Sequence, residues 1–231
     1  MNKLFDVEGP FLSALTKIAD IIIINFLFII CSLPIFTFGA ACTAMHYVTL
    51  KMVKNEESYT VKSFFKSFKL NFKQSTIIWL ITLVIGAVIF ADVKVITGNY
   101  LQAINLSEGI GKIVLVLIMV VTLLYVFMAV YVFPVLSRFD NTVVNTMKNA
   151  LIMSIRHLPF TVAIILITFV PLVLIAYEPK ALILVFIIFG LCAFCNSFLF
   201  VKVFTKYMPE ASIAIDEEIQ IPDDGQTNNN I

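Results

Sequence analysis

Long uninterrupted runs of apolar residues, separated by shorter polar segments, dominate the chain. A helix needs about 20 apolar residues to cross the hydrocarbon core of a bilayer, and several of the runs reach that length. Because the runs are continuous and do not alternate with polar residues, they favour helices over the strands of a membrane barrel. The spans that we expect are residues 19–38, 76–96, 110–136, 158–177 and 181–204.

The composition supports a membrane location. Of the 231 residues, 60% are apolar and only 13% are charged, whereas a soluble domain carries about 25% charged residues. A soluble fold of this size has too little interior for so many apolar side chains, so lipid must cover part of it. We expect an all-α fold, a polytopic membrane helical bundle of about five transmembrane helices with a basic amphipathic cytoplasmic helix. It would occupy residues 1–208, followed by a mobile acidic cytoplasmic tail over residues 209–231.

Basic residues gather on one side of the expected spans. Six lie between the first and second spans, three between the third and fourth, and two at or just after the inner end of the fifth, which makes eleven of the sixteen basic residues. By the positive-inside rule this side is cytoplasmic. Five spans then place the amino terminus outside and the carboxyl terminus inside. The eleven residues are Lys51, Lys54, Lys62, Lys66, Lys69, Lys73, Arg138, Lys148, Arg156, Lys202 and Lys206.

The sequence allows more than one path for the first apolar run through the membrane. From Ile18 to Leu50 it is longer than one span requires at 1.5 Å per residue, and Pro34 and Gly39 interrupt it. One kinked span followed by a bent interfacial helix fits this pattern. A re-entrant pair of helices also fits it, and would place the amino terminus inside. We favour the kinked span.

Residues 60–73 combine phenylalanines on one helical face with lysines on another. This pattern is typical of a basic amphipathic helix that lies on an anionic membrane surface. A helix packed on the base of the bundle and a docking helix for a partner protein are the alternatives. The residues that we expect to contact the membrane surface or a partner are Lys62, Phe65, Lys66, Phe68, Lys69, Phe72 and Lys73.

Ionisable and amide side chains inside the spans are few, and nearly all charges lie at the span ends. Such groups are candidates for function because burying them is costly. Asp20 lies at the start of the first span, whereas Asn25 and Asn196 lie deeper, in the first and fifth spans. Proton-coupled pumps usually carry carboxylates near the midplane, where this chain has amides. Because amides join helices by hydrogen bonding, we favour that role for Asn25 and Asn196 over a substrate site.

The sequence contains no zincin motif, phosphate-binding glycine loop or nucleophile elbow, so we predict neither an enzyme nor a cofactor. The net charge of +1 gives no reason to expect nucleic acid binding. The four cysteines lie within apolar runs, which favours packing over disulfides or metal ligands. His46 and His157 lack the spacing of metal ligands, and we expect them to pack as well.

Three short segments resemble a known family. Residues 32–44, SLPIFTFGAACTA, resemble the SLPI-x-T-x-G-A-A-x-T-A signature of the YesL-like family, a bacterial membrane family of unknown function. Residues 64–74 resemble its F-x-x-F-K-x-N-F-K-Q run, and residues 131–139 resemble its Y-x-F-P-L-x-S-R-F run. The resemblance extends over residues 5–208 and leaves out the acidic tail.

The resemblance implies a multi-pass protein of the bacterial plasma membrane. Members of the family are often encoded beside components of sugar-uptake ABC transporters, and no catalytic residues are assigned to them. We therefore expect an accessory or assembly protein associated with a carbohydrate ABC uptake system. Its partners would be the lipid bilayer and a transporter permease or another membrane protein. The alternative is a small stand-alone transporter or channel with a continuous polar path through the bundle.

The same motifs predict tight helix junctions. Pro34 removes a helix hydrogen bond and should kink or end the span. The small residues after it form a smooth face, which lets two helices approach closely in lipid. Pro134 predicts a second break on the basic side. We expect the helix junction or a partner contact at Pro34, Thr37, Gly39, Ala40, Thr43, Pro134 and Arg138.

Overall fold

The computed structural model describes residues 10–56, 59–97, 108–177 and 184–208, and this part of the chain is helical without strands. The predicted tail over residues 209–231 lies outside the described residues. Five helices are long and apolar enough to cross a membrane, which confirms the predicted fold class. The elements are α1 (Pro10–Ser32), the short 3-10 helix η2 (Ile35–Thr37), α2 (Phe38–Val53), α3 (Thr60–Thr97), α5 (Glu108–Arg138), α6 (Val143–Arg156), α7 (Leu158–Tyr177) and α8 (Val185–Phe204).

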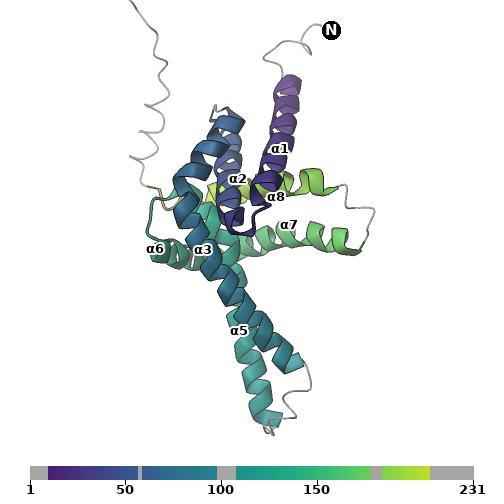
Figure 1. Ribbon diagram of the computed structural model, residues 1–231, viewed down its shortest axis with the longest axis vertical. Helices are drawn as coiled ribbons and strands as arrows, with labels where there is room; N and C mark the ends of the chain where they lie inside the picture. The colour runs from purple at the N-terminus through teal and green to yellow at the C-terminus, as the bar shows by residue number, and fades with distance from the viewer. Residues whose placement is uncertain (1–9, 57–58, 98–107, 178–183, 209–231) are drawn as a thin grey trace, which may run out of the picture.

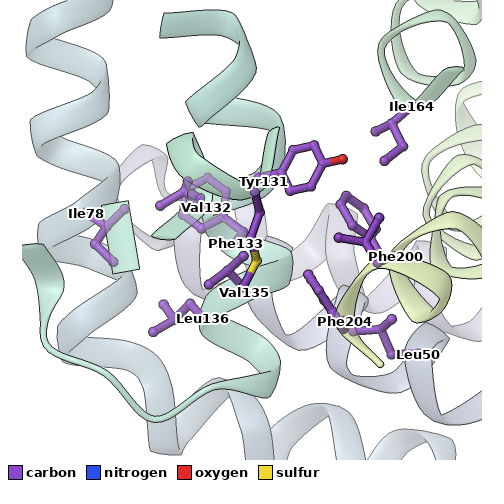
Figure 2. Packing of buried hydrophobic residues seen from close by; sticks show 13 residues of the cluster. Leu50, Ile78, Tyr131, Val132, Phe133, Val135, Leu136, Ile164, Phe200 and Phe204 are labelled. Atoms are coloured by element: carbon purple, nitrogen blue, oxygen red, sulfur yellow. The ribbon is translucent and has the colours of Figure 1, made fainter. Parts of the chain in front are cut away.

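Helix α2 lies at the centre of the molecule, in contact with α1, α3, α5 and α8 (Figure 1). Its sequence is rich in small residues, and most of its side chains are buried. We call α2 and the helix segments packed around it the hub. One hydrophobic cluster of the hub joins the end of α5 to α2, α3, α7 and α8, with Tyr131 beside Phe200 (Figure 2). A second cluster joins α1 to α2 and to the start of α3.

Two apolar helix pairs extend away from the hub in different directions (Figure 1). One consists of the second half of α3 and the first half of α5, and the other consists of α7 and α8. The two helices of each pair pack against each other, α8 also packs against α1 and α2, and large apolar side chains cover the outer surface of both pairs. Phe90 of α3 and Phe186 of α8, for example, are 64% and 54% exposed. Exposed apolar surface of this extent is stable only against lipid or another apolar partner.

The first apolar run forms a helical hairpin, so the favoured interpretation as one kinked span is wrong. Phe28 and Phe38 lie together near the turn, with ring centroids 5.7 Å apart. At the other end of the hairpin, Lys17 Nζ donates a hydrogen bond to Asn55 Oδ1 at 2.7 Å. Because α1 and α2 run antiparallel, the amino end of α1 lies beside the connection from α2 to α3, the arrangement that the re-entrant alternative describes.

This hairpin predicts that both ends of it face the same side of the membrane. In a variant without the four native cysteines, we expect single cysteines at Ala14→Cys and Tyr59→Cys to react with an impermeant maleimide in the same vesicles. Both side chains are exposed, and Ala14 lies at the first residue of its candidate span while Tyr59 lies in the connection before α3. Labelling in right-side-out and inverted vesicles checks this expectation. Reaction of the two cysteines from opposite sides would contradict the hairpin.

The basic amphipathic segment is the first half of α3 and continues without a break into the apolar half of the same 38-residue helix. Phe64 is fully buried against α1 and α2, and Phe68 packs on Phe64 and Phe72. Phe65 and Phe72 are partly exposed. One side of this segment is thus packed on the bundle, as in the first alternative, while its lysines face outward.

Candidate functional site

The turn between α1 and α2 has exposed apolar side chains and capped carbonyl groups. Leu33 and Ile35 are 75% and 72% exposed. The hydroxyl of Thr37 lies 2.6 Å from the carbonyl oxygen of Cys31 and 2.7 Å from that of Pro34, so its single proton is shared between them. Irregular backbone is tolerated in an apolar medium only where protein groups satisfy it. The turn is therefore built to lie in apolar surroundings.

Two further side chains complete the capping. Ser32 Oγ donates to the carbonyl of Ile29 at 3.0 Å, and the indole Nε1 of Trp79 in α3 donates to the carbonyl of Ile35 at 2.7 Å. Pro34 adopts an extended conformation directly before η2. Because a proline cannot donate to the preceding turn, it separates α1 from η2 as the sequence predicts.

Replacement of Thr37 by valine tests the capping. Thr37→Val keeps the shape of the side chain but removes the hydroxyl donor from the carbonyl of Cys31, whereas the carbonyl of Pro34 keeps the backbone N–H of Thr37 at 2.9 Å. We expect it to lower the free energy of unfolding by about 1–2 kcal/mol, the usual cost of unsatisfied buried groups. Reversible unfolding in mixed micelles, followed by circular dichroism, measures the change. As a control, Thr205→Val removes an exposed hydroxyl that bonds its own helix, and we expect no measurable change.

Gly39 sets the closest approach of α2 to α3. A Cβ atom at this position would lie 2.5 Å from the backbone oxygen of Ser75 and 2.8 Å from Cβ of Trp79. Ala40 and Thr43 are fully buried on the same helix, and Thr43 Oγ1 donates to the carbonyl of Gly39 at 2.8 Å. The small residues therefore serve a junction within the chain.

Helix α5 continues through Pro134 and ends one turn later at Arg138, so the predicted break lies at Arg138 and not at the proline. Ser137 Oγ donates to the carbonyl of Pro134 at 2.7 Å. The guanidinium of Arg138 lies 3.8 Å from Glu56, which also contacts Lys51 at 4.0 Å and Lys54 at 3.5 Å. One carboxylate thus links the end of α2 to the end of α5.

A cavity of about 280 Å³ opens beside this ion cluster. The second and third family-like segments meet there, because α3 supplies Lys66 and Asn71 while α5 supplies Ser137 and Arg138. Gln74 of α3 also lines it and donates to the carbonyl of Asn141. The remaining lining residues are Tyr47, Ser67, Leu70, Leu136, Phe139 and Asp140. Of the seven residues expected to form the amphipathic surface, only Lys66 lines this cavity.

The predicted intramembrane polar residues join helices. Asn25 Nδ2 donates to the carbonyl of Val185 at 3.1 Å, and its Oδ1 accepts from the backbone N–H of Gly190 at 2.9 Å. Asn196 Nδ2 donates to Thr168 Oγ1 at 2.9 Å, while its buried Oδ1 has no partner among the described residues. Asp20 accepts a hydrogen bond from Thr60 at 2.8 Å and ties α1 to the start of α3.

The two histidines pack within the hub. His46 is buried with its ring edge-on to Phe200. His157, between α6 and α7, lies with Nε2 3.1 Å from the hydroxyl of Tyr207. Burial, followed by the charges of Lys206 and Arg156, lowers the pKa of the His157 imidazole. The shift favours the neutral ring, and the contact with Tyr207 ties the start of α7 to the residues just after α8.

Comparisons with known proteins found one family and two relatives that are similar to this chain. Residues 21–93 match a family described as "Protein of unknown function, DUF624". The chain is 28% identical over 170 residues to the uncharacterized protein YteU of Bacillus subtilis (strain 168), over 73% of this chain and 72% of YteU. It is 29% identical over 126 residues to the uncharacterized protein YesL of the same organism, over 54% of this chain and 55% of YesL. The resemblance to the YesL-like family is confirmed. No solved structure matches the chain significantly.

The segment matched to DUF624 runs from α1 through the hairpin turn into α3. It includes the capped turn, the close approach at Gly39 and the α3 side of the cavity. Sequence reasoning missed Trp79, which joins α3 to the turn within this segment, and Glu56, which connects the segment to Arg138 of α5. Trp79 is the single tryptophan of the chain and lies near the start of an apolar run, which is a signal that would have singled it out.

Proposed function

We propose that the protein is an accessory or assembly subunit that binds another integral membrane protein through its apolar helix pairs. The observation that carries this proposal is the divergence of the two pairs from the hub, with large apolar side chains along both (Figure 1). Helices that associate with a partner in lipid do so by packing and by small-residue contacts rather than by charge. The hub is tightly joined by its own contacts, so the pairs are the parts available to a partner.

The resemblance to the YesL-like family supports a carbohydrate ABC uptake system in the bacterial plasma membrane as the partner. The membrane-like helical character and the uncharacterized relatives fit this proposal without naming a partner. We propose a non-catalytic role, which agrees with polar side chains that serve as helix links. A permease subunit offers apolar helices of the length that α3–α5 and α7–α8 would pack against.

The alternative, a stand-alone transporter or channel, receives less support from the geometry. It needs a polar path through Asn25, Asn196 and the threonines at positions 76, 82 and 122. Asn25 and Asn196 instead bond within the α1, α7 and α8 group. Thr82 and Thr122 bond within their own helices in the other pair. The cavity beside Arg138 is lined by none of the five.

Site-specific photo-crosslinking in the native membrane tests the proposed function. A benzoylphenylalanine replaces Phe90 or Phe186, which keeps an aromatic ring at each exposed position. The matched control replaces Tyr59, which is 83% exposed but lies in the connection before α3. We expect an adduct with a permease subunit of an ABC importer at Phe90, Phe186 or both, and none at Tyr59, when adducts are identified by mass spectrometry.

Adducts that consist only of lipid, or that form equally at all three positions, would contradict a specific membrane partner. Adducts with a second copy of the chain alone would show self-association and would also remove the support for an accessory role. Sugar flux into proteoliposomes that contain only this chain, above empty vesicles, would favour the transporter alternative.

A further inference from the structure

The cavity beside Arg138 combines positive charge with hydrogen-bonding groups in a space of small-ligand size. Its volume of about 280 Å³ lies near the lower end of the range for small-molecule pockets. Three elements build it: the middle of α2, the first half of α3, and the end of α5 with the loop after it. A site built from several rigid elements holds its geometry better than one on a single loop.

The charge balance around the cavity is positive. Lys66 and Arg138 line it, and Lys51 and Lys54 share the carboxylate of Glu56 with Arg138. Glu56 and the lining residue Asp140 supply two negative charges against these four positive ones. The ammonium group of Lys66 has no ion-pair partner in the part of the chain that the structure describes. This surplus of positive charge favours an anionic ligand.

The position of the cavity along the membrane normal favours phosphate as the anion. On α3 the lining ends at Gln74, and the apolar half of the helix begins directly after it. On α5 the lining begins at Leu136, where the apolar part of that helix ends. Leu70, at the rim, is 78% exposed. The cavity therefore lies where two helices pass from apolar to polar surroundings, which is the level of lipid phosphate groups.

We propose that this cavity binds one phosphate group, supplied by an anionic phospholipid headgroup or by a soluble phosphate ester. Lys66 of α3 and Arg138 of α5 supply the positive charge for the phosphate oxygens, because both line the cavity. Arginine and lysine are the side chains that bind phosphate most effectively. Asp140 limits the affinity through repulsion. Bound phosphate would stabilise the contact between α3 and α5 at the hub.

The experiment uses the full chain in detergent and follows the midpoint of thermal unfolding. One arm adds phosphatidylglycerol in mixed micelles, with phosphatidylcholine as the neutral comparison. A second arm adds inorganic phosphate, with chloride at equal ionic strength as its comparison. A ligand that binds the folded state raises the midpoint with its concentration, and the dependence gives an apparent Kd.

Lys66→Gln removes the unpaired charge and leaves the packing intact, because its side chain is exposed. For whichever probe raises the midpoint, phosphatidylglycerol or inorganic phosphate, we expect Lys66→Gln to weaken binding about fivefold. We expect Lys69→Gln to change the affinity less than about twofold. Lys69 is the matched control because it lies on the same helix, is also exposed and does not line the cavity. Asp140→Asn should tighten binding about twofold, since a repelling charge is lost.

A Lys66-dependent effect of phosphatidylglycerol supports the proposal and identifies a lipid. The same dependence with inorganic phosphate, and not with lipid, supports it and identifies a soluble ligand. Equal weakening by Lys66→Gln and Lys69→Gln would show diffuse attraction to anions and overturn it. An unchanged midpoint in both arms of the wild-type protein would overturn it too. These results do not depend on a membrane partner, so they separate this site from the proposed accessory role.

Discussion

Gly39→Ala lowers the free energy of unfolding by about 2–3 kcal/mol, in the upper part of the range for overpacked cores. The added methyl group would meet the backbone oxygen of Ser75 at 2.5 Å and Cβ of Trp79 at 2.8 Å, and neither atom can move without displacing α3. Separation of α2 from α3 also pulls the indole of Trp79 from the carbonyl of Ile35. Unfolding by a denaturing detergent, followed by circular dichroism, measures the loss.

Gly86→Ala is the matched control for this substitution. A Cβ atom at Gly86 would meet only the far end of the Tyr125 side chain, which can rotate away. We expect this variant to lose about 1 kcal/mol or less, because the cost is that of moving one side chain and its hydrogen bond to Thr82. Equal losses at the two glycines would show that the approach at Gly39 is not the constraint that the structure indicates.

Asn25→Leu has the second large expected effect. The leucine fills a similar volume but removes both hydrogen bonds that join α1 to α8, those to the carbonyl of Val185 and from the N–H of Gly190. We expect a loss of about 2 kcal/mol, because two interhelical hydrogen bonds are lost at about 1 kcal/mol each. Asn25→Asp should cost more than Asn25→Leu, since a carboxylate oxygen would then face the Val185 carbonyl.

Asn196→Leu provides the comparison for Asn25→Leu. Asn196 donates one hydrogen bond, to Thr168, and its buried Oδ1 is unsatisfied among the described residues. Asn196→Leu therefore also removes an unsatisfied buried oxygen. We expect it to lower the free energy of unfolding by less than about 1 kcal/mol. A larger loss at Asn196 than at Asn25 would contradict the roles that the hydrogen bonds assign.

The spans were predictable because the signal for them is local. A run of about 20 apolar residues favours lipid whatever the rest of the chain does, because its own length and composition decide this. The end of α1 just before Pro34 was predictable for the same reason, since a proline acts on its own turn. Small residues around Gly39 likewise predicted a close contact between helices, although not which helix would be the neighbour.

The return of α2 was not predictable in the same way. Its turn carries Leu33, Ile35 and Phe36 in place of polar turn residues, so hydropathy alone continues the span across it. What makes the turn tolerable is the shared proton of Thr37 and the indole of Trp79, which comes from another helix. The cavity was missed because Lys66 and Arg138 lie far apart in sequence and meet only through packing.

The link between Asn25 and Gly190 has a consequence for synthesis. The two residues are 165 positions apart, so a ribosome adding about 5–20 residues per second reaches the second roughly ten to thirty seconds after the first. During that interval the amide of Asn25 lacks its two partners in α8, the carbonyl of Val185 and the N–H of Gly190. The first helix is thus joined to its last neighbour only when synthesis of the described helices is nearly finished, and a chain cut short before α8 leaves the Asn25 amide without these partners.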